Sequence, residues 1–271
     1  MNRTPTLDAP GAAASAAYGD MTDDLVSIIT PAYRAAHVIG DTVRSVLAQT
    51  HGNWELLIAE DCSPDDTRQV VRGWTEADPR IRLIEMPRNG GPAAARNAAL
   101  EQARGRWLAF LDSDDLWLPT KLERTIAFAR KRDAAFAFTG FRRISADGSR
   151  TGRYIGVPPR LTYRQLLGNT AIATSTVLLD ARRVGTIRMR KTYYDDFHCW
   201  LQILKQGHVA FGLDEDLMRY RVLDRSVSRN KRRSARHVWA AYHDLEQFGF
   251  AKSLWYFSQY AVRGFMKYRQ F

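Results

Sequence analysis

Residues 107–119 read WLAFLDSDDLWLP, an apolar run that passes directly into a cluster of acidic side chains. The first five residues predict a buried strand, because no polar group interrupts them. Asp112, Ser113, Asp114 and Asp115 follow where that strand ends. Clustered carboxylates suit a hard cation such as Mn²⁺ or Mg²⁺, which takes oxygen ligands and keeps positions open for substrate phosphates. Asp and Ser also favour turns and helix starts, so spacing alone leaves both explanations open.

Predicted strands and helices alternate on either side of this stretch. We expect strands at 25–30, 54–59, 81–86, 107–111 and 134–138, and helices at 38–49, 65–74, 92–104 and 119–131. A strand at 172–179 and a helix at 195–206 should follow. The alternation predicts an α/β fold with a single Rossmann-like, mostly parallel sheet and helices on both faces. Ligands bind beyond the carboxyl ends of the strands in such sheets.

Polar and aromatic side chains stand at two further strand ends. Thr30, Pro31 and Tyr33 close the first strand, which Pro31 should terminate, and Glu60 and Asp61 close the second. A carboxylate at such a position can accept a hydrogen bond from a base or a ribose hydroxyl. We therefore expect these ends and the acidic cluster to form one binding edge.

A glycine-rich turn, NGGPAAARN at residues 89–97, leads into a predicted helix. A helix start of this kind can face a phosphate or a nucleoside. More commonly, Gly and Pro simply interrupt a loop. Arg96 and Asn97 stand among alanines here, which favours a ligand.

The helix predicted at 195–206 begins with two adjacent acids, Asp195 and Asp196. Adjacent helical residues face different directions, so the two carboxylates should have different roles. A carboxylate at a helix start stays ionised, as a general base must. Spacing alone favours the plainer explanation, an N-cap and a first-turn acid.

Composition limits the class of protein. The 271 residues suit one large domain with a tail, which we divide into a disordered lead-in (1–24), an α/β domain (25–215) and a basic loop with a helical tail (216–271). A net charge of +11 favours anionic partners such as nucleotides, nucleic acid or a membrane surface. Two cysteines without CxxC spacing argue against a disulfide scaffold or structural zinc site.

The N-terminal residues contain no continuous apolar segment of the kind a signal peptide needs. No window approaches the roughly 18 apolar residues that span a bilayer. We therefore expect a cytoplasmic protein, and peripheral association with the cytoplasmic face of the inner membrane stays open.

Five stretches, in this order, resemble the family-2 inverting glycosyltransferases with the GT-A fold. They are VSIITPAY (26–33), IAEDCSPDDT (58–67), NGGPAAARNAAL (89–100), WLAFLDSDDLWLP (107–119) and YDDFHCWLQILKQG (194–207). Each is weak alone, but jointly they are specific. Within the family the chain is most similar to teichuronic-acid and exopolysaccharide transferases. The resemblance implies transfer from a nucleotide-sugar, expected to be a UDP-sugar, to a hydroxyl of a bacterial surface glycan, expected to be lipid-linked.

The resemblance also implies roles for individual residues. Asp114 would ligate Mn²⁺ or Mg²⁺ on the diphosphate, Asp112 would share the metal and lie nearer the ribose, and Asp196 would be the catalytic base. Asp61 would meet the uracil edge. The wider nucleotide-sugar set would be Thr30, Pro31, Tyr33, Glu60, Asp61, Arg96, Asn97, Asp112 and Ser113. Asp195 and Trp200 would lie on the acceptor side.

Several departures from the family pattern stand in the sequence. Glu60 replaces the usual aspartate, and Cys62 replaces a glycine. Leu223 replaces a frequent histidine, so contacts to the diphosphate leaving group would come from Arg221, Arg225 or Arg229. The QxxRW element of processive polymerases is absent, which implies one sugar per binding event.

Two other classes of function compete with this interpretation. The excess of Lys and Arg would suit a nucleic-acid-binding module, but acids rather than bases crowd the predicted cleft, so no nucleic acid is expected. The same carboxylates would serve a metal-dependent nucleotidyltransferase or phosphohydrolase, which would release pyrophosphate or monophosphate instead of a nucleoside diphosphate.

The C-terminal tail predicts an amphipathic helix. One stripe contains Phe250, Leu254, Phe257, Ala261, Phe265 and Tyr268, and the opposite side contains Lys252, Gln259, Arg263 and Lys267. Such a helix can rest on an anionic membrane surface or pack on the protein core, and the pattern leaves both open.

Overall fold

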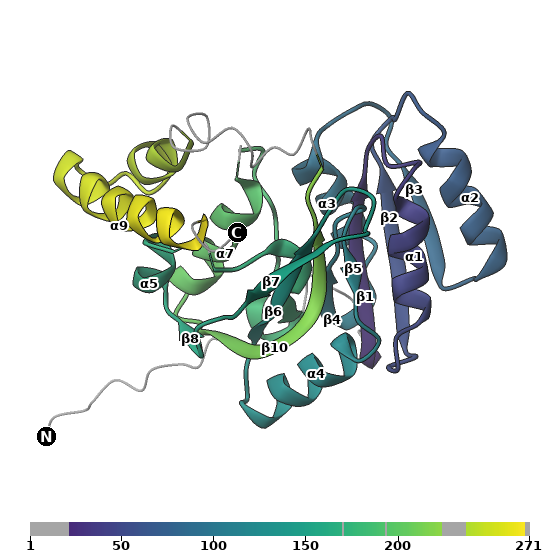
Figure 1. Cartoon of the computed structure of the whole chain (residues 1–271), viewed down its shortest axis with the longest axis horizontal. Helices are drawn as coiled ribbons and strands as arrows, with labels where there is room; N and C mark the ends of the chain where they lie inside the picture. The colour runs from purple at the N-terminus through teal and green to yellow at the C-terminus, as the bar shows by residue number, and fades with distance from the viewer. Residues whose placement is uncertain (1–21, 170, 193, 224–236, 269–271) are drawn as a thin grey trace, which may run out of the picture.

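The computed structural model describes residues 22–169, 171–192, 194–223 and 237–268. A mixed sheet of ten strands forms the centre of this described part (Figure 1). Its order is β3-β2-β1-β4-β9-β6-β10-β5, and β7 and β8 pair with β6 and β10. The first strands bring the predicted site residues to one edge of the sheet.

The strands are β1 (Thr22–Ala32), β2 (Trp54–Glu60), β3 (Ile81–Glu85), β4 (Gly105–Phe110), β5 (Leu116–Trp117), β6 (Phe136–Ile144), β7 (Thr151–Ile155), β8 (Arg160–Leu161), β9 (Leu178–Asp180) and β10 (Ala210–Arg221). The helices are α1 (Ile39–Leu47), α2 (Thr67–Ala77), α3 (Pro92–Leu100), α4 (Lys121–Lys131), α5 (Tyr163–Leu167), α6 (Ala181–Val184), α7 (Asp195–Lys205) and α9 (Phe250–Tyr268). The chain also forms a 3₁₀ turn, η1 (Thr174–Thr176), and a π-helical turn, η3 (Ala241–Leu245).

The first half of the sheet is parallel and agrees with the prediction. β3, β2, β1 and β4 all run in the same direction. Their residues alternate between two cores: Ile28 of β1 packs with α1, α2 and α4, whereas Ile29 packs with α3 and α7. This division follows from the two-residue period of a strand. The predicted α/β fold with helices on both faces is therefore confirmed.

The second half of the sheet departs from the prediction. The strand expected at 172–179 is wrong, because Thr174–Thr176 form η1 and only Leu178–Asp180 enter the sheet, as β9. β9 runs antiparallel between β4 and β6. The hydroxyl of Thr176 donates to the carbonyl of Ala173 at 2.6 Å, a local bond that competes with strand pairing.

One strand continues past the end that we expected, and another strand was not expected at all. β1 runs through Pro31, which pairs with Ala59 of β2. β10 extends to Arg221 and pairs with β6, so the domain boundary drawn after residue 215 falls inside a strand. Acidic residues interrupt the apolar alternation of β10, and its register shifts beside Asp216. That interruption removed the pattern by which a strand is predicted.

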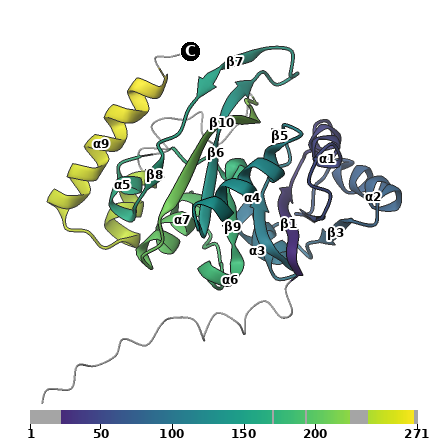
Figure 2. The same ribbon diagram turned by 90° about the horizontal axis from the view of Figure 1, so that it is seen from below.

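A buried glutamate fastens the C-terminal part to the body of the protein. Glu246 accepts hydrogen bonds from Gln202 and Lys205 of α7 and from the hydroxyl of Tyr163 of α5. Beyond it, α9 lies at the end of the molecule opposite α2 (Figures 1 and 2). The tail is thus anchored to the same helix that carries Asp195 and Asp196.

Lys121, the first residue of α4, is fully buried. Its Nζ has no hydrogen-bond partner within the described residues and lies 3.9 Å from the centre of the Trp117 ring. Burial lowers the pKa of Lys121 from 10.5 to about 7. The ring compensates only part of the cost of removing an ammonium from water.

We predict that Lys121→Met raises the free energy of unfolding by about 1 to 2 kcal/mol at pH 7, because an apolar chain of similar length removes the buried charge. In the wild type, between about pH 7 and pH 10.5, the Lys121 amine is protonated in the unfolded chain and neutral in the folded chain. Wild-type stability should therefore rise with pH above 7, and its deficit against the variant should shrink by pH 9. Urea titrations at both pH values measure this. Lys131→Met, at an exposed position of the same helix, is the matched control. A variant less stable than the wild type at both pH values would contradict the prediction.

Candidate active site

The acidic residues after β4 form a short loop at the edge where the parallel strands end. The hydroxyl of Thr42 in α1 donates to the backbone oxygens of Ser113 and Asp115, both at 2.9 Å, and so fixes the path of the loop. Asp115 is buried, whereas Asp112 and Asp114 are partly exposed. Asp112 and Asp114 are thus the carboxylates that a ligand can reach.

Burial and the closeness of like charges make a positive charge near this loop favourable. Burial, and then the charge of Asp112, raises the pKa of Asp114 to about 6. Burial together with the charges of Asp114 and Asp112 raises the pKa of Asp115 well above its usual value. A cation near the loop would relieve the cost of ionising these groups.

Arg96 joins the acidic loop to the start of α7. From α3, its guanidinium donates to the carboxylate of Asp112 at 2.6 Å and to that of Asp195 at 2.9 Å. Burial raises the pKa of Asp195 to about 6 in spite of this ion pair. Burial would lower the pKa of Arg96, but the charges of Asp112 and Asp195 raise it above its usual value. Asp195, expected on the acceptor side, instead faces Arg96 in the interior.

Asn97 holds the segment that leads into α7. Its Nδ2 donates to the carbonyl of Met189 and its Oδ1 accepts from the Met189 amide, both at 2.8 Å. Both ends of the side-chain amide are therefore engaged within the protein. The ligand contact expected for Asn97 is replaced here by the support of a neighbouring segment.

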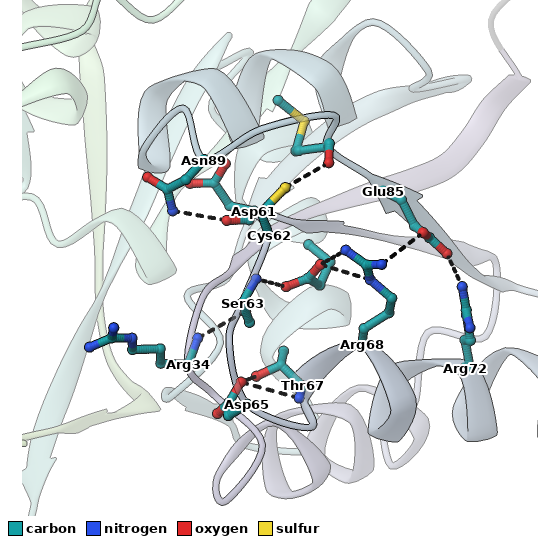
Figure 3. A network of polar contacts seen from close by, with 12 residues as sticks. Arg34, Asp61, Cys62, Ser63, Asp65, Thr67, Arg68, Arg72, Glu85 and Asn89 are labelled. Atoms are coloured by element: carbon teal, nitrogen blue, oxygen red, sulfur yellow. Dashed lines mark hydrogen bonds and ion pairs between the residues drawn. The ribbon is translucent and has the colours of Figure 1, made fainter.

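Asp61 anchors the glycine-rich turn before α3 (Figure 3). Its two carboxylate oxygens accept the amides of Gly90 and Gly91, each at 2.7 Å, and Asn89 donates to its carbonyl oxygen. Gly91 has a φ of +85°, a conformation that glycine adopts without strain. A carboxylate offers about four acceptor positions, so the predicted contact with a uracil edge would add to these bonds.

Glu60 points into the protein rather than towards a ligand. It is fully buried and accepts hydrogen bonds from the amide of Ser63 and from Arg68. Its expected place among the nucleotide-sugar contacts is therefore corrected to support of the β2–α2 loop. Cys62, which stands where the family has glycine, has a φ of 55°, and its thiol donates to the carbonyl of Met86 at 2.9 Å (Figure 3).

At the end of β1, Tyr33 offers the accessible aromatic surface. It is 44% exposed, and the guanidinium of Arg34 lies 5.3 Å from the centre of its ring. Pro31 is partly exposed. Thr30 is fully buried, and its hydroxyl has no partner among the described residues. Tyr33 and Pro31 can reach a nucleoside, whereas Thr30 lies beneath them in the strand.

α7 begins at the predicted residue, and its second acid is the more accessible one. Asp196 is partly exposed and accepts a hydrogen bond of 2.5 Å from the hydroxyl of Thr174. The acceptor-side position expected for Trp200 is wrong, because its ring is 1% exposed and meets Phe110 edge-on at 5.1 Å. Trp200 belongs instead to the apolar core on the buried side of α7.

Two side chains that the sequence analysis did not single out touch both halves of the site. Thr174 bonds to Asp196, and Ser175 bonds to the acidic loop, where its hydroxyl donates to Asp115 at 2.6 Å. Both belong to η1 and are buried. The available signal was three consecutive hydroxyl residues before an apolar run, which we assigned to a strand.

Arg221 lies against the acidic loop with its donors engaged. It is 3% exposed and donates to the backbone oxygens of Asp114 and Ala146 and to the carboxylate of Asp41, at 2.9, 2.8 and 3.1 Å. Its geometry supports the loop rather than an open leaving-group site. Arg225 and Arg229, the other residues expected there, lie outside the described residues.

Comparison with known proteins identifies the family. Residues 27–196, which contain the acidic loop, Arg96 and both acids of α7, match the description "Glycosyl transferase family 2". The chain belongs to glycosyl transferase family 2. This confirms the resemblance carried by the five sequence stretches, and the protein is a glycosyltransferase.

Relatives within family 2 cover nearly the whole chain. A Bacillus subtilis (strain 168) protein named for teichuronic acid biosynthesis, the glycosyltransferase TuaG, is 43% identical over 90% of this chain and 97% of its own length. The Escherichia coli protein WfgD, named UDP-Glc:alpha-D-GlcNAc-diphosphoundecaprenol beta-1,3-glucosyltransferase, is 36% identical over 92% of this chain and 96% of its own.

Solved structures of more distant glycosyltransferases share the GT-A fold. S. aureus TarS 1–349, in complex with UDP-GlcNAc, is 17% identical, with a TM-score of 0.64 over 89% of this chain and 72% of that one. The mannosyltransferase PcManGT from Pyrobaculum calidifontis, in complex with GDP-Man and Mn²⁺, is 18% identical, with a TM-score of 0.63 over 88% and 73%. These likenesses confirm the predicted fold.

The acidic loop fits the divalent metal that the GT-A fold implies. Among the residues that the structure describes, no three His, Cys, Asp or Glu side chains form a group that could hold a metal ion. Asp112 and Asp114 nevertheless provide two oxygen donors, and Mg²⁺ is typically held by one or two carboxylates with substrate phosphates completing the shell. Asp112 already pairs with Arg96. Asp114 is therefore the better placed ligand.

We predict that Arg96→Met lowers the free energy of unfolding by about 3 kcal/mol, because it leaves buried Asp195 without its partner. Losing Arg96 also removes a charge that lowers the pKa of Asp195, so that pKa should rise further. Urea unfolding of Arg96→Met, Asp195→Asn and the double variant measures the coupling between the two residues. Asp195→Asn should restore part of the stability lost in Arg96→Met. Additive losses in the double variant would contradict the buried ion pair.

Proposed function

We propose that the chain transfers a sugar from a UDP-sugar to a hydroxyl of a lipid-linked bacterial surface glycan, with a divalent metal, inversion of configuration and one sugar per encounter. The observation that carries this proposal is the meeting of the acidic loop with the start of α7, where Arg96 pairs with both Asp112 and Asp195. The name of WfgD, with UDP-Glc as donor and a diphosphoundecaprenol-linked acceptor, supports both substrate classes.

The donor would lie across the carboxyl ends of β1, β2 and β4. Tyr33 and Pro31 would cover the nucleoside, and Asp61 would accept a hydrogen bond from the base edge. Asp61 is well prepared for this role because Gly90 and Gly91 hold its carboxylate in one orientation. Glu60 and Asn97 would not touch the donor; they would support the site by holding the β2–α2 loop and the segment before α7.

Asp114, with Asp112 beside it, would hold Mn²⁺ or Mg²⁺ at the diphosphate. The ion would neutralise the negative charge that develops on the departing nucleoside diphosphate. Arg96 neutralises Asp112, which leaves Asp114 free for this role. Arg221 adds a second positive charge beneath the loop.

Asp196 would act as the general base. Its carboxylate takes the proton from the acceptor hydroxyl while that oxygen forms a bond to the anomeric carbon of the donor. The bond from the anomeric carbon to the diphosphate oxygen breaks, and its electron pair leaves with the nucleoside diphosphate. A single displacement from the opposite face inverts the configuration and needs no covalent enzyme intermediate. The absence of QxxRW supports one transfer per encounter.

We predict that Asp196→Asn lowers kcat by at least about a hundredfold, with the KM for the donor changed less than about threefold, because the base acts in the chemical step. Nucleoside-diphosphate release, measured over a panel of sugar nucleotides with Mn²⁺ and an acceptor, gives both constants. Asp133→Asn, the same chemical change at an exposed position between α4 and β6, is the matched control and should keep the wild-type kcat. Wild-type turnover by Asp196→Asn would remove Asp196 from the mechanism. Release of pyrophosphate or monophosphate would favour the nucleotidyltransferase or phosphohydrolase alternative.

The lipid-linked acceptor would bring the enzyme to a membrane surface, and α9 supports such an association. Its residues Ser253, Tyr256, Phe257 and Tyr260 face the protein, so part of the predicted stripe packs on the core. Four of the six large apolar side chains that are exposed in the described residues belong to α9 and form its exposed face: Leu254, Trp255, Val262 and Phe250, whose ring also meets that of Trp239.

Charge selects an anionic lipid surface as the occupant of this face. The 19 residues of α9 include Lys252, Arg263 and Lys267 and contain no Asp or Glu. A helix with exposed aromatic and aliphatic side chains and only basic charges suits the interface of an anionic bilayer. No helix among the described residues is long and apolar enough to cross a membrane. We therefore propose peripheral binding, on the cytoplasmic face where nucleotide-sugars are available.

We predict that the chain floats with vesicles containing anionic phospholipid and that Leu254→Glu/Trp255→Glu abolishes flotation, because two charges would enter the apolar contact. Gln69→Glu/Ala77→Glu adds the same acidic side chains at exposed positions of α2, at the opposite end of the molecule, and should still float (Figure 1). Equal flotation of both variants would contradict the membrane face. A wild-type dimer that Leu254→Glu/Trp255→Glu dissociates, seen by analytical ultracentrifugation without vesicles, would assign the face to a second copy instead.

A further inference from the structure

The 3₁₀ turn η1 lies between the two parts of the proposed active site. It packs against β4, β6 and β10, and all three of its side chains are buried. Thr174 is 6% exposed and Ser175 is 1% exposed. Their hydroxyls donate hydrogen bonds to acidic residues outside the turn. Buried hydroxyls directed at carboxylates are costly to remove and strongly orienting.

Ser175 closes the acidic loop. Its hydroxyl donates to the carboxylate of Asp115 at 2.6 Å and accepts from the amide of Asp112 at 3.0 Å. One oxygen thus joins the first and last residues of the four-residue loop, with Asp114 held between them. The carbonyl of Ser175 accepts from the Trp117 indole at 2.8 Å, which fixes the turn to the strand that follows the loop.

Thr174, one residue earlier, holds Asp196. Its hydroxyl donates to one carboxylate oxygen of Asp196 at 2.5 Å, and the amide of Phe197 donates to the other at 2.7 Å. Consecutive Cα atoms are about 3.8 Å apart in any trans chain, so adjacent residues of a rigid turn fix a short separation. The acidic loop and Asp196 are therefore both held by hydrogen bonds to adjacent residues of η1.

We propose that Thr174 and Ser175 are a pair of positioning residues: Ser175 shapes the loop that presents Asp114 to the donor, and Thr174 orients Asp196 towards the acceptor. This inference rests on the proposed function and assigns each of the two residues a separate role in it. Ser175 acts on the binding of metal and donor, whereas Thr174 acts on the chemical step. Substitutions of these two adjacent residues should then have different kinetic effects, one on kcat and the other on donor KM and UDP–Mn²⁺ affinity.

Steady-state kinetics and UDP–Mn²⁺ calorimetry test the pair. Thr174→Val keeps the shape and removes the hydroxyl, so kcat should fall about tenfold or more, with donor KM and UDP–Mn²⁺ affinity within about twofold of wild type. Thr174→Ser keeps the hydroxyl and should recover most of kcat. Ser175→Ala should weaken UDP–Mn²⁺ binding and raise donor KM about tenfold, with kcat largely kept at saturation. Thr174→Ala replaces Thr174→Val if that variant folds poorly.

Specific outcomes would overturn the inference. A wild-type kcat in Thr174→Val or Thr174→Ala would show that Thr174 does not position Asp196. An unchanged UDP–Mn²⁺ affinity in Ser175→Ala would show that Ser175 does not shape the acidic loop for donor binding. Equal losses of kcat and affinity in both variants would assign the turn a purely structural role. A wild-type chain that neither binds UDP–Mn²⁺ nor releases nucleoside diphosphate would overturn the proposed function itself, which separates that failure from a failure of the positioning pair.

Discussion

The site depends on one buried arginine held between two carboxylates. Arg96 on α3 meets Asp112 of the acidic loop and Asp195 of α7, residues that are 16 and 99 positions away in the chain. Without Arg96, the buried carboxylate of Asp195 would lose its ion-pair partner in a poorly solvated place, and Asp112 would lose its partner at the loop. The ion pairs therefore specify an arrangement more than they add stability, because Arg96 compensates both carboxylates only when it lies between the loop and α7.

A second connection runs through η1 and is made of neutral hydroxyls. Thr174 and Ser175 connect the same two elements that Arg96 joins through charge. Hydroxyls can donate and accept at once, which lets Ser175 bridge an amide and a carboxylate. Together the two connections fix the separation and the orientation of the acidic loop relative to Asp196, which a single ion pair could not do.

The sequence predicted the parallel half of the fold well, because apolar strands such as 107–111 and amphipathic helices carry local periodicity. It did not predict the partners of polar residues. Arg96 and Asp195 both looked like ligand contacts, and Glu60 did too, since spacing cannot show that a charged side chain is satisfied inside the protein. β10 was missed because three consecutive acids interrupt its alternation; one of them, Asp216, pairs with Arg142 and Arg219 in the sheet. Trp200 was assigned to the acceptor side by analogy to a family motif, but the structure buries its ring against Phe110 and Phe136.

Carboxylates outnumber guanidiniums in the site, and this excess of negative charge would favour the binding of a cation. Asp112, Asp114, Asp115, Asp195 and Asp196 provide five carboxylates, against which Arg96 and Arg221 provide two guanidiniums. Burial and neighbouring negative charges raise the pKa of Asp114 and Asp195 to about 6, so ionising these carboxylates costs more here than in water. A divalent ion at Asp114 would favour the ionised loop, and a donor diphosphate would then share that ion. Arg96 makes its hydrogen bonds to Asp112 and Asp195 and acts on Asp114 only through its more distant charge, so a metal at Asp114 would supply further positive charge at the donor phosphates.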